Sequence, residues 1–157
     1  MNSIGIVIPA YNESENIVRL IKKIRNNLNC LIIIVDDSSD LKTKNIITKN
    51  KLRNIKYFNR GKKLGRGSAV IFGFKKIINI KKNISCLIEM DADLSHNPSE
   101  LKRNIKYFDN NSLDLLIGSR YLNGSKIINW PISRRILSKM SNTLARVLIG
   151  VPINDYT

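Results

Sequence analysis

The sequence predicts an α/β fold in which a mostly parallel central sheet carries helices on both faces. Short runs rich in β-branched residues alternate with longer segments whose apolar residues recur at helical spacing. The run CLIIIV, residues 30–35, is apolar throughout, which is typical of a parallel strand covered on both faces. Because this alternation extends along the 157 residues, we expect one domain over residues 1–157 with a substantial core.

The first half of the chain supplies three expected strands and two helices. Residues 4–8 (IGIVI) are β-branched apart from Gly5, and a proline follows them. The apolar run at 30–35 and the segment 54–59 (NIKYFN) are the second and third expected strands. Residues 41–50 form a short basic helix. The longer helix, 14–28, repeats its apolar side chains every three or four residues: Ile17, Leu20, Ile21, Ile24 and Leu28.

The second half continues the alternation. A glycine-rich turn opens a helix at 67–80, and the apolar run at 85–90 is the fourth strand. A helix at 98–108 has a proline near its start, where the missing N–H costs least. Residues 113–119 (LDLLIGS) are expected to form a fifth strand, and residues 133–150 a basic helix.

The composition is that of a folded, strongly basic protein. Hydrophobic residues make up 43% and charged residues 25%, with a net charge of +15 and a pI near 10.1. Such charge favours nucleic acid, an anionic membrane or phosphorylated ligands, and does not choose among them. Cys30 and Cys86 lie in apolar runs without metal-binding spacing, which indicates reduced thiols. No run reaches the length of a spanning helix and the start lacks a signal-peptide pattern, so we expect a cytoplasmic protein.

Three polar clusters follow expected strands: PAYNE, DDSSD and DADLSH. Ligands of parallel sheets collect at the carboxyl ends of strands, so these clusters mark a candidate site. Asp91 and Asp93 are two residues apart, so in extended geometry both carboxylates face the same side, which would allow one Mg²⁺ or Mn²⁺ ion to bind both. The alternative for this short motif is a capped turn before the next helix.

The other polar residues near these clusters have two interpretations each. We favour a structural role for Asp36 in its loop and a ligand role for Asp37, on a base or ribose. GKKLGRGS lacks the Walker and dinucleotide patterns, and is either an anion-binding turn at a helix start or a solvated loop. His96 is preferred as a hydrogen-bonded turn residue over a base or metal ligand.

Taken together, the motifs resemble a known family. VIPAYNESENI, IIIVDDSS, NRGKKLGRGSAV, EMDADLSHNPSEL, GSRYLNGS and NWPISRRILSKMSNTLAR occur in that order. They resemble the catalytic domain of dolichyl-phosphate mannosyltransferases and their prokaryotic polyprenyl-phosphate relatives, in glycosyltransferase family 2. The resemblance runs from Ile4 to the chain end and implies the GT-A nucleotide-diphospho-sugar transferase fold.

The resemblance also implies roles for individual residues. Asp91 and Asp93 would hold Mg²⁺ or Mn²⁺ on the donor diphosphate, with Ala92 and Ser95 nearby. Arg120, Arg134 and Ser138 would meet the acceptor phosphate. The remaining expected substrate-binding residues line the nucleotide pocket: Pro9, Tyr11, Glu13, Val35 and Asp37.

The chain departs from the family pattern at several positions. Ser38 replaces a glycine, Leu41 stands where an aspartate is usual, and Arg66 occupies the centre of a motif that usually reads GLG. Relatives continue beyond the final INDYT with further residues, including another arginine for phosphate. We therefore expect a catalytic domain that is incomplete at its C-terminus.

The expected function is transfer of a hexose, foremost mannose from GDP-mannose, onto a polyprenyl or dolichyl phosphate, with inversion and with a divalent metal. The expected partners are a nucleotide-sugar donor, a polyprenyl-phosphate acceptor and an anionic membrane surface. A separate membrane partner stays open, and no nucleic acid is expected. The alternatives are a basic nucleic-acid-binding module and an inactive, truncated glycosyltransferase.

The basic helix at 133–150 has two interpretations. Its apolar residues and its arginines and lysines suit either a core helix with a solvated face or a helix lying on a membrane. Trp130 stands just before it, and tryptophan favours the bilayer interface. We expect weak, salt-sensitive binding to anionic membranes, with the protein peripheral at their surface.

Overall fold

The structure is a computed structural model that describes residues 3–52, 54–122, 130–151, 153 and 155. It divides into two compact units, residues 1–107 and 108–157, and each is described by itself. Parts of the GSRYLNGS and NWPISRR motifs, residues 123–129, lie outside the described residues.

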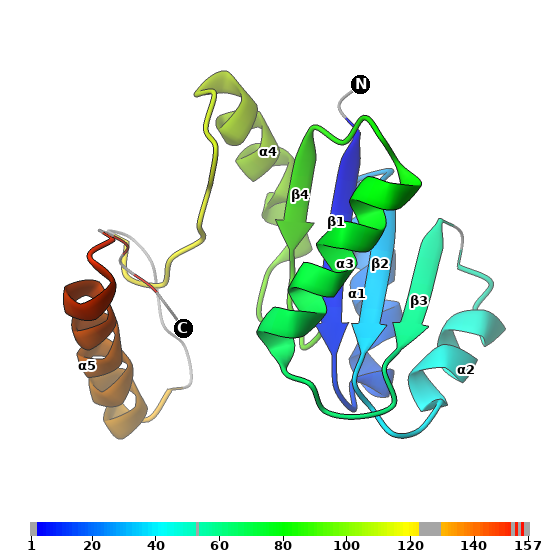
Figure 1. The fold of residues 1–157 in the computed structure, drawn as a ribbon, viewed down its shortest axis with the longest axis horizontal. Helices are drawn as coiled ribbons and strands as arrows, with labels where there is room; N and C mark the ends of the chain where they lie inside the picture. The colour runs from blue at the N-terminus through cyan, green and yellow to red at the C-terminus, as the bar shows by residue number, and fades with distance from the viewer. Residues whose placement is uncertain (1–2, 53, 123–129, 152, 154, 156–157) are drawn as a thin grey trace. The chain divides into compact units, whose positions relative to one another are not determined.

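The first unit is built around a parallel sheet of four strands in the order β3-β2-β1-β4 (Figure 1). The strands are β1 (Ile4–Ala10), β2 (Leu31–Asp36), β3 (Ile55–Asn59) and β4 (Cys86–Glu89). The helices between them are α1 (Ser14–Asn27), α2 (Lys42–Lys49) and α3 (Arg66–Ile80). A short 3₁₀ turn, η1 (Pro98–Glu100), leads into α4 (Leu101–Asn110). The expected α/β fold with a parallel sheet and these four strands is confirmed.

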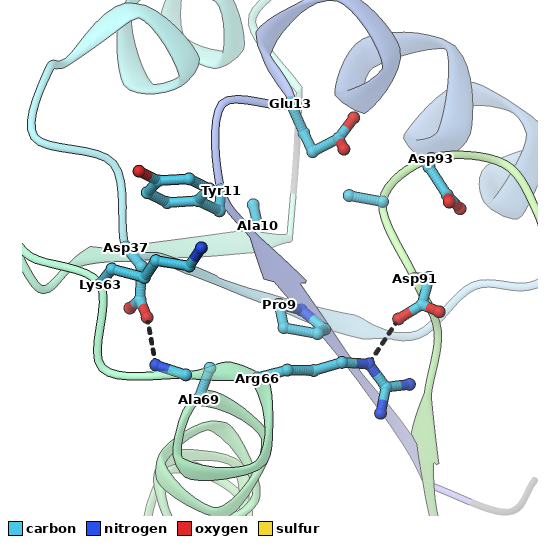
Figure 2. Close-up of a pocket in the computed structure, with 12 residues that line it drawn as sticks. Pro9, Ala10, Tyr11, Glu13, Asp37, Lys63, Arg66, Ala69, Asp91 and Asp93 are labelled. Atoms are coloured by element: carbon cyan, nitrogen blue, oxygen red, sulfur yellow. Dashed lines mark hydrogen bonds and ion pairs between the residues drawn. The ribbon is translucent and has the colours of Figure 1, made fainter. Parts of the chain in front are cut away.

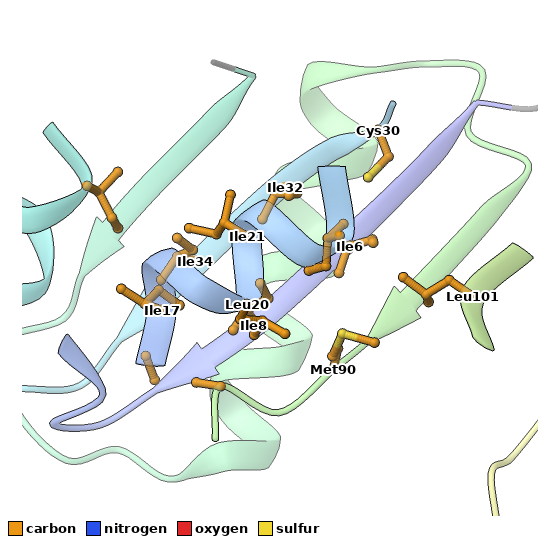
Figure 3. Packing of buried hydrophobic residues seen from close by; sticks show 14 residues of the cluster. Ile6, Ile8, Ile17, Leu20, Ile21, Cys30, Ile32, Ile34, Met90 and Leu101 are labelled. Atoms are coloured by element: carbon orange, nitrogen blue, oxygen red, sulfur yellow. The ribbon is translucent and has the colours of Figure 1, made fainter. Parts of the chain in front are cut away.

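Helices cover both faces of this sheet, as expected from the apolar run of β2. Alternate residues of β1 and β2 point to opposite faces. Ile6, Ile8, Ile32 and Ile34 pack with α1 in one cluster, which Figure 3 shows. Val7, Ile33 and Val35 pack with Ala69 and Ile77 of α3 on the other face. Backbone and side chain approach closely there, since a Cβ on Gly73 would lie 2.5 Å from Val7.

The prediction of a strand at residues 113–119 is wrong. These residues carry no strand and form an irregular segment after α4. Leu115 is 70% exposed, and Leu116 and Ile117 are exposed as well. An apolar run predicts a strand only where a neighbouring strand supplies hydrogen bonds and burial, and the structure provides neither for this run.

The second unit contains α5 (Ile132–Ile149), which corresponds to the expected basic helix. Gly150 ends it in the left-handed conformation, with φ of 72°. Within the residues that the structure describes, none of the helices has the length and apolarity required to cross a membrane.

Candidate active site

A hollow of about 300 Å³ lies at the carboxyl ends of β1, β2 and β4 (Figure 2). The chain runs from β1 through β2 to β3 on one side of β1, and then places β4 on its other side. Such a reversal of strand order is where α/β sheets bind ligands. The residues that line the hollow come from all three polar clusters and from the glycine-rich loop: Pro9, Ala10, Tyr11, Glu13, Asp37, Lys63, Gly65, Arg66, Ala69, Asp91, Ala92 and Asp93.

Asp36 has the structural role that the sequence favoured. Its carboxylate is fully buried and accepts hydrogen bonds from the backbone N–H of Ser38 at 2.8 Å and from the Ser38 hydroxyl. The Tyr57 hydroxyl donates to its other oxygen at 2.8 Å. Burial, together with this hydrogen bond to Asp36, raises the pKa of Tyr57. Asp36 therefore fixes the end of β2 against β3.

Asp37 lines the hollow and binds the glycine-rich loop. Arg60 donates to both of its oxygens, at 2.5 and 2.8 Å, and the backbone N–H groups of Leu64 and Gly65 donate at 2.8 and 3.1 Å. Burial raises the pKa of Asp37, but these hydrogen bonds outweigh it and the pKa ends below its ordinary value. The expected contact of Asp37 with a nucleotide stays a prediction.

Arg66, in the first turn of α3, connects two acids at the end of β4. Its Nε donates to Asp91 Oδ1 at 2.9 Å, and its Nη2 pairs with Glu89 Oε1 (Figure 2 shows the Asp91 contact). His96 accepts a hydrogen bond from the Asp91 backbone N–H at 3.2 Å, so it is a turn residue as preferred. The sequence gives no signal for these two ion pairs, because both partners of Arg66 lie more than 20 residues away in the chain.

Asp93 is the second acid of the expected metal pair. The backbone N–H of Ser95 donates to its Oδ1 at 2.9 Å. Burial alone would raise the pKa of Asp93, but hydrogen bonds from Ser95 and the electrostatic interaction with His96 outweigh it. The pKa therefore lies below its ordinary value, and the carboxyl is ionised at neutral pH. Among the described residues no three His, Cys, Asp or Glu side chains gather as a complete metal cage. Two carboxylates at the hollow fit Mg²⁺ or Mn²⁺, which complete their shell with water and substrate phosphates.

The other expected nucleotide residues are brought together only in part. Pro9, Tyr11 and Glu13 line the hollow, and Lys63 lies over the Tyr11 ring with its Nζ 4.7 Å from the centroid. Ala92 also lines it, while Ser95 does not and instead supports Asp93. Val35 is fully buried against α3, so its side chain offers no surface to a substrate.

The expected acceptor residues gather in the second unit around two aromatic side chains. Arg120 and Arg134 lie over Trp130, with their guanidinium carbons 4.8 and 4.1 Å from the ring centroid. Tyr121 donates a hydrogen bond to the Ser138 hydroxyl at 2.6 Å. Asp155 is paired with Arg120, a contact between residues 35 apart for which the sequence pattern gives no signal.

Residues 5–157 match the family model described as Glycosyl transferase family 2. The chain belongs to this family. The expected resemblance to polyprenyl-phosphate mannosyltransferases is confirmed by the names of similar proteins.

One relative is a polyprenol monophosphomannose synthase of Mycolicibacterium smegmatis, 38% identical over 156 residues, which cover 97% of this chain and 58% of the relative. A dolichol-phosphate mannosyltransferase of Pyrococcus furiosus is 36% identical, over 93% of this chain and 41% of the relative. An undecaprenyl-phosphate mannosyltransferase of Micrococcus luteus is 32% identical, over 96% and 62%. The chain thus spans about half the length of these relatives.

A solved structure described as the crystal structure of S. aureus TarS supports the fold. It has a TM-score of 0.57 and 24% sequence identity, and the match covers 81% of this chain and 23% of that chain. At this identity the likeness confirms the α/β fold and nothing further.

Proposed function

We propose that this family 2 domain transfers mannose from GDP-mannose to a polyprenyl phosphate. The names of the three relatives support the sugar and the class of acceptor. The observation that carries the proposal is the hollow, because Asp91 and Asp93 line it together with Lys63 and Arg66. A nucleoside diphosphate with its divalent cation requires two kinds of group: carboxylates that bind the cation and positively charged side chains that bind the phosphates.

The donor would lie along the hollow. Tyr11, Glu13 and Asp37 offer an aromatic face and hydrogen-bond acceptors to the nucleoside, and Lys63 offers a positive charge to the diphosphate. Asp91 and Asp93 would hold Mg²⁺ or Mn²⁺. When bound, the metal neutralises the charge that develops on the leaving diphosphate.

The acceptor phosphate would be held by Arg120 and Arg134, since planar guanidinium groups match phosphate oxygens in geometry. An oxygen of this phosphate forms the new bond to the anomeric carbon as the bond to the GDP oxygen breaks, and the bonding pair leaves with GDP. An in-line displacement inverts the anomeric carbon. The acceptor is already an anion at neutral pH, so the arginines need to position it and no general base is required.

A membrane-surface location follows from the acceptor. The large apolar side chains of α5 are each more than half exposed, whereas the residues it buries are the polar Ser138 and Asn142. We propose that this helix lies at an anionic bilayer, near the headgroups where the lipid phosphate is presented. The exposed apolar residues along the helix are Ile132, Ile136, Leu137, Met140, Leu144, Val147, Leu148 and Ile149.

The test is a transfer assay with the purified chain, a short polyprenyl phosphate and radiolabelled GDP-mannose, with Mn²⁺ or with a chelator. Label should enter the lipid fraction only with metal, and UDP-glucose should not replace GDP-mannose. If the folded chain binds GDP but transfers no sugar from any donor, the inactive-glycosyltransferase alternative replaces this proposal.

A further inference from the structure

Arg66 is a cation placed inside the expected metal site. Its guanidinium contacts Asp91 at 2.9 Å and also pairs with Glu89, so it joins the last residue of β4 to the first acid of the DAD motif. It lines the same hollow as Asp93. The two acids that face the guanidinium are 29% and 30% exposed, which leaves their interaction with Arg66 partly shielded from water.

The backbone aims this side chain at the acids. Gly65 precedes the helix with φ of +92°, a conformation that side chains other than glycine rarely adopt. The N–H of Gly65 is held by Asp37, so the turn that launches α3 is fixed by the Asp37–Arg60 pair. The backbone from which Arg66 reaches Asp91 is therefore held in place, although the Arg66 side chain itself is 56% exposed.

A carboxylate oxygen that accepts from a guanidinium is a poorer ligand for a second cation, because both cations draw on the same negative charge. A divalent metal entering alone meets the repulsion of Arg66 and must share Asp91 with it. A nucleoside diphosphate changes this balance, since its oxygens provide Arg66 with a new anionic partner.

We propose that Arg66 makes metal binding depend on the donor: it holds Asp91 in the free protein and releases it to the cation when a nucleoside diphosphate occupies the hollow. Arg66 is thus a positioning residue that couples the two ligands. The inference rests on the proposed function, because it takes the donor diphosphate and the metal to share this hollow. Coupling of this kind is reciprocal, so metal and GDP must strengthen each other by the same factor.

The experiment measures the affinity of Mn²⁺ by calorimetry, with Mn²⁺ alone and with saturating GDP, for the full chain and for Arg66→Leu, which restores the usual GLG motif. Removing a unit charge in contact with a ligand carboxylate should tighten binding of Mn²⁺ alone by about tenfold or more. The factor by which GDP strengthens Mn²⁺ binding should be smaller in the variant than in the natural chain. Arg66→Gln, a polar replacement, should behave as Arg66→Leu does.

Lys62→Leu is the matched control. It removes one positive charge from the same loop, and Lys62 is exposed and is not among the described residues that line the hollow. It should leave both affinities within about twofold of the natural chain, because its charge is screened by solvent. Equal or weaker binding of Mn²⁺ alone in folded Arg66→Leu and Arg66→Gln, or equal tightening in Lys62→Leu, overturns the inference. The transfer assay reports on the proposed function separately, since sugar transfer by the natural chain does not require this coupling.

Discussion

The guanidinium of Arg134 stacks over the indole ring of Trp130, with its carbon 4.1 Å from the ring centroid. Arg120 lies over the same ring at 4.8 Å and is also paired with Asp155, a carboxylate that is 8% exposed. The backbone N–H and the Nε of Arg120 both donate to Asp155, at 2.9 and 2.8 Å. Trp130 is therefore a common platform for the two arginines that the family resemblance assigns to the acceptor phosphate.

Replacing Trp130 by leucine should weaken binding of a polyprenyl phosphate and spare binding of GDP. Each cation–π contact at an exposed site is worth about 0.5–1 kcal/mol, so losing two of them predicts a loss of about fivefold to thirtyfold in acceptor affinity. Fluorescence titration with a labelled polyprenyl phosphate measures the first affinity, and calorimetry with GDP the second.

Two further variants serve as comparisons for Trp130→Leu. Trp130→Phe keeps an aromatic face and should retain most of the acceptor affinity, while Arg134→Ala should lose at least as much as Trp130→Leu. An equal loss of GDP affinity in Trp130→Leu would show that Trp130 supports the whole fold and not the acceptor arginines in particular.

Asp93→Asn should weaken the Mn²⁺-dependent part of GDP binding by about tenfold or more, since an amide replaces a charged oxygen ligand. The fold should persist, because an amide oxygen can still accept the hydrogen bond from the Ser95 backbone N–H. Calorimetry with GDP, with and without Mn²⁺, measures the difference. Glu100→Gln removes an exposed surface acid and is the control. Unchanged Mn²⁺-dependent binding in Asp93→Asn would falsify the metal assignment.

Asp37→Asn should destabilise the first unit. Asp37 and Arg60 expose only 6% and 10% of their side chains, and removing one charge of such a pair costs on the order of 3 kcal/mol. Because the folded pKa of Asp37 lies below its unfolded value, its stabilisation is present above the unfolded pKa and is lost as pH falls through the folded pKa.

Urea unfolding at neutral pH and in acid measures both effects. Asp37→Asn should unfold at lower urea at neutral pH, and the difference from the natural chain should shrink below about pH 4. Asp40→Asn removes a half-exposed acid from the same loop and should change stability by less than about 1 kcal/mol. A pH-independent difference between Asp37→Asn and the natural chain would contradict the assigned role of the charge.

Local patterns predicted the first unit well, because each pattern reports its own element. The apolar spacing of Ile17, Leu20 and Ile24 reports the face of α1 that is buried, and the run of β2 reports a strand covered on both sides. The prediction of a strand at 113–119 was wrong because its apolar run predicts burial in a sheet, whereas Leu115, Leu116 and Ile117 are exposed in the structure. The contacts of Asp37 with Arg60 and of Arg66 with Glu89 could not be predicted, since each joins residues 23 apart in the chain. The first joins the ends of the neighbouring strands β2 and β3, and the second joins the first turn of α3 to the end of β4.

The last prediction concerns α5 and the membrane. Its exposed apolar residues include Ile132, Val147 and Leu148, each 75% exposed, and Arg134, Arg135 and Lys139 are exposed as well. A core helix would bury this apolar surface, whereas a bilayer interface accepts both the apolar residues and the basic ones. Each basic residue near an anionic surface contributes on the order of 1 kcal/mol, so binding should be weak, reversible and lost at high salt.

The full chain should float with vesicles containing anionic lipid at low salt and stay behind at high salt. Val147→Asp, which places a charge of the wrong sign on the apolar surface, should abolish flotation while the folded chain still binds GDP, and the absence of flotation by the folded natural chain at low salt would leave no support for a membrane surface.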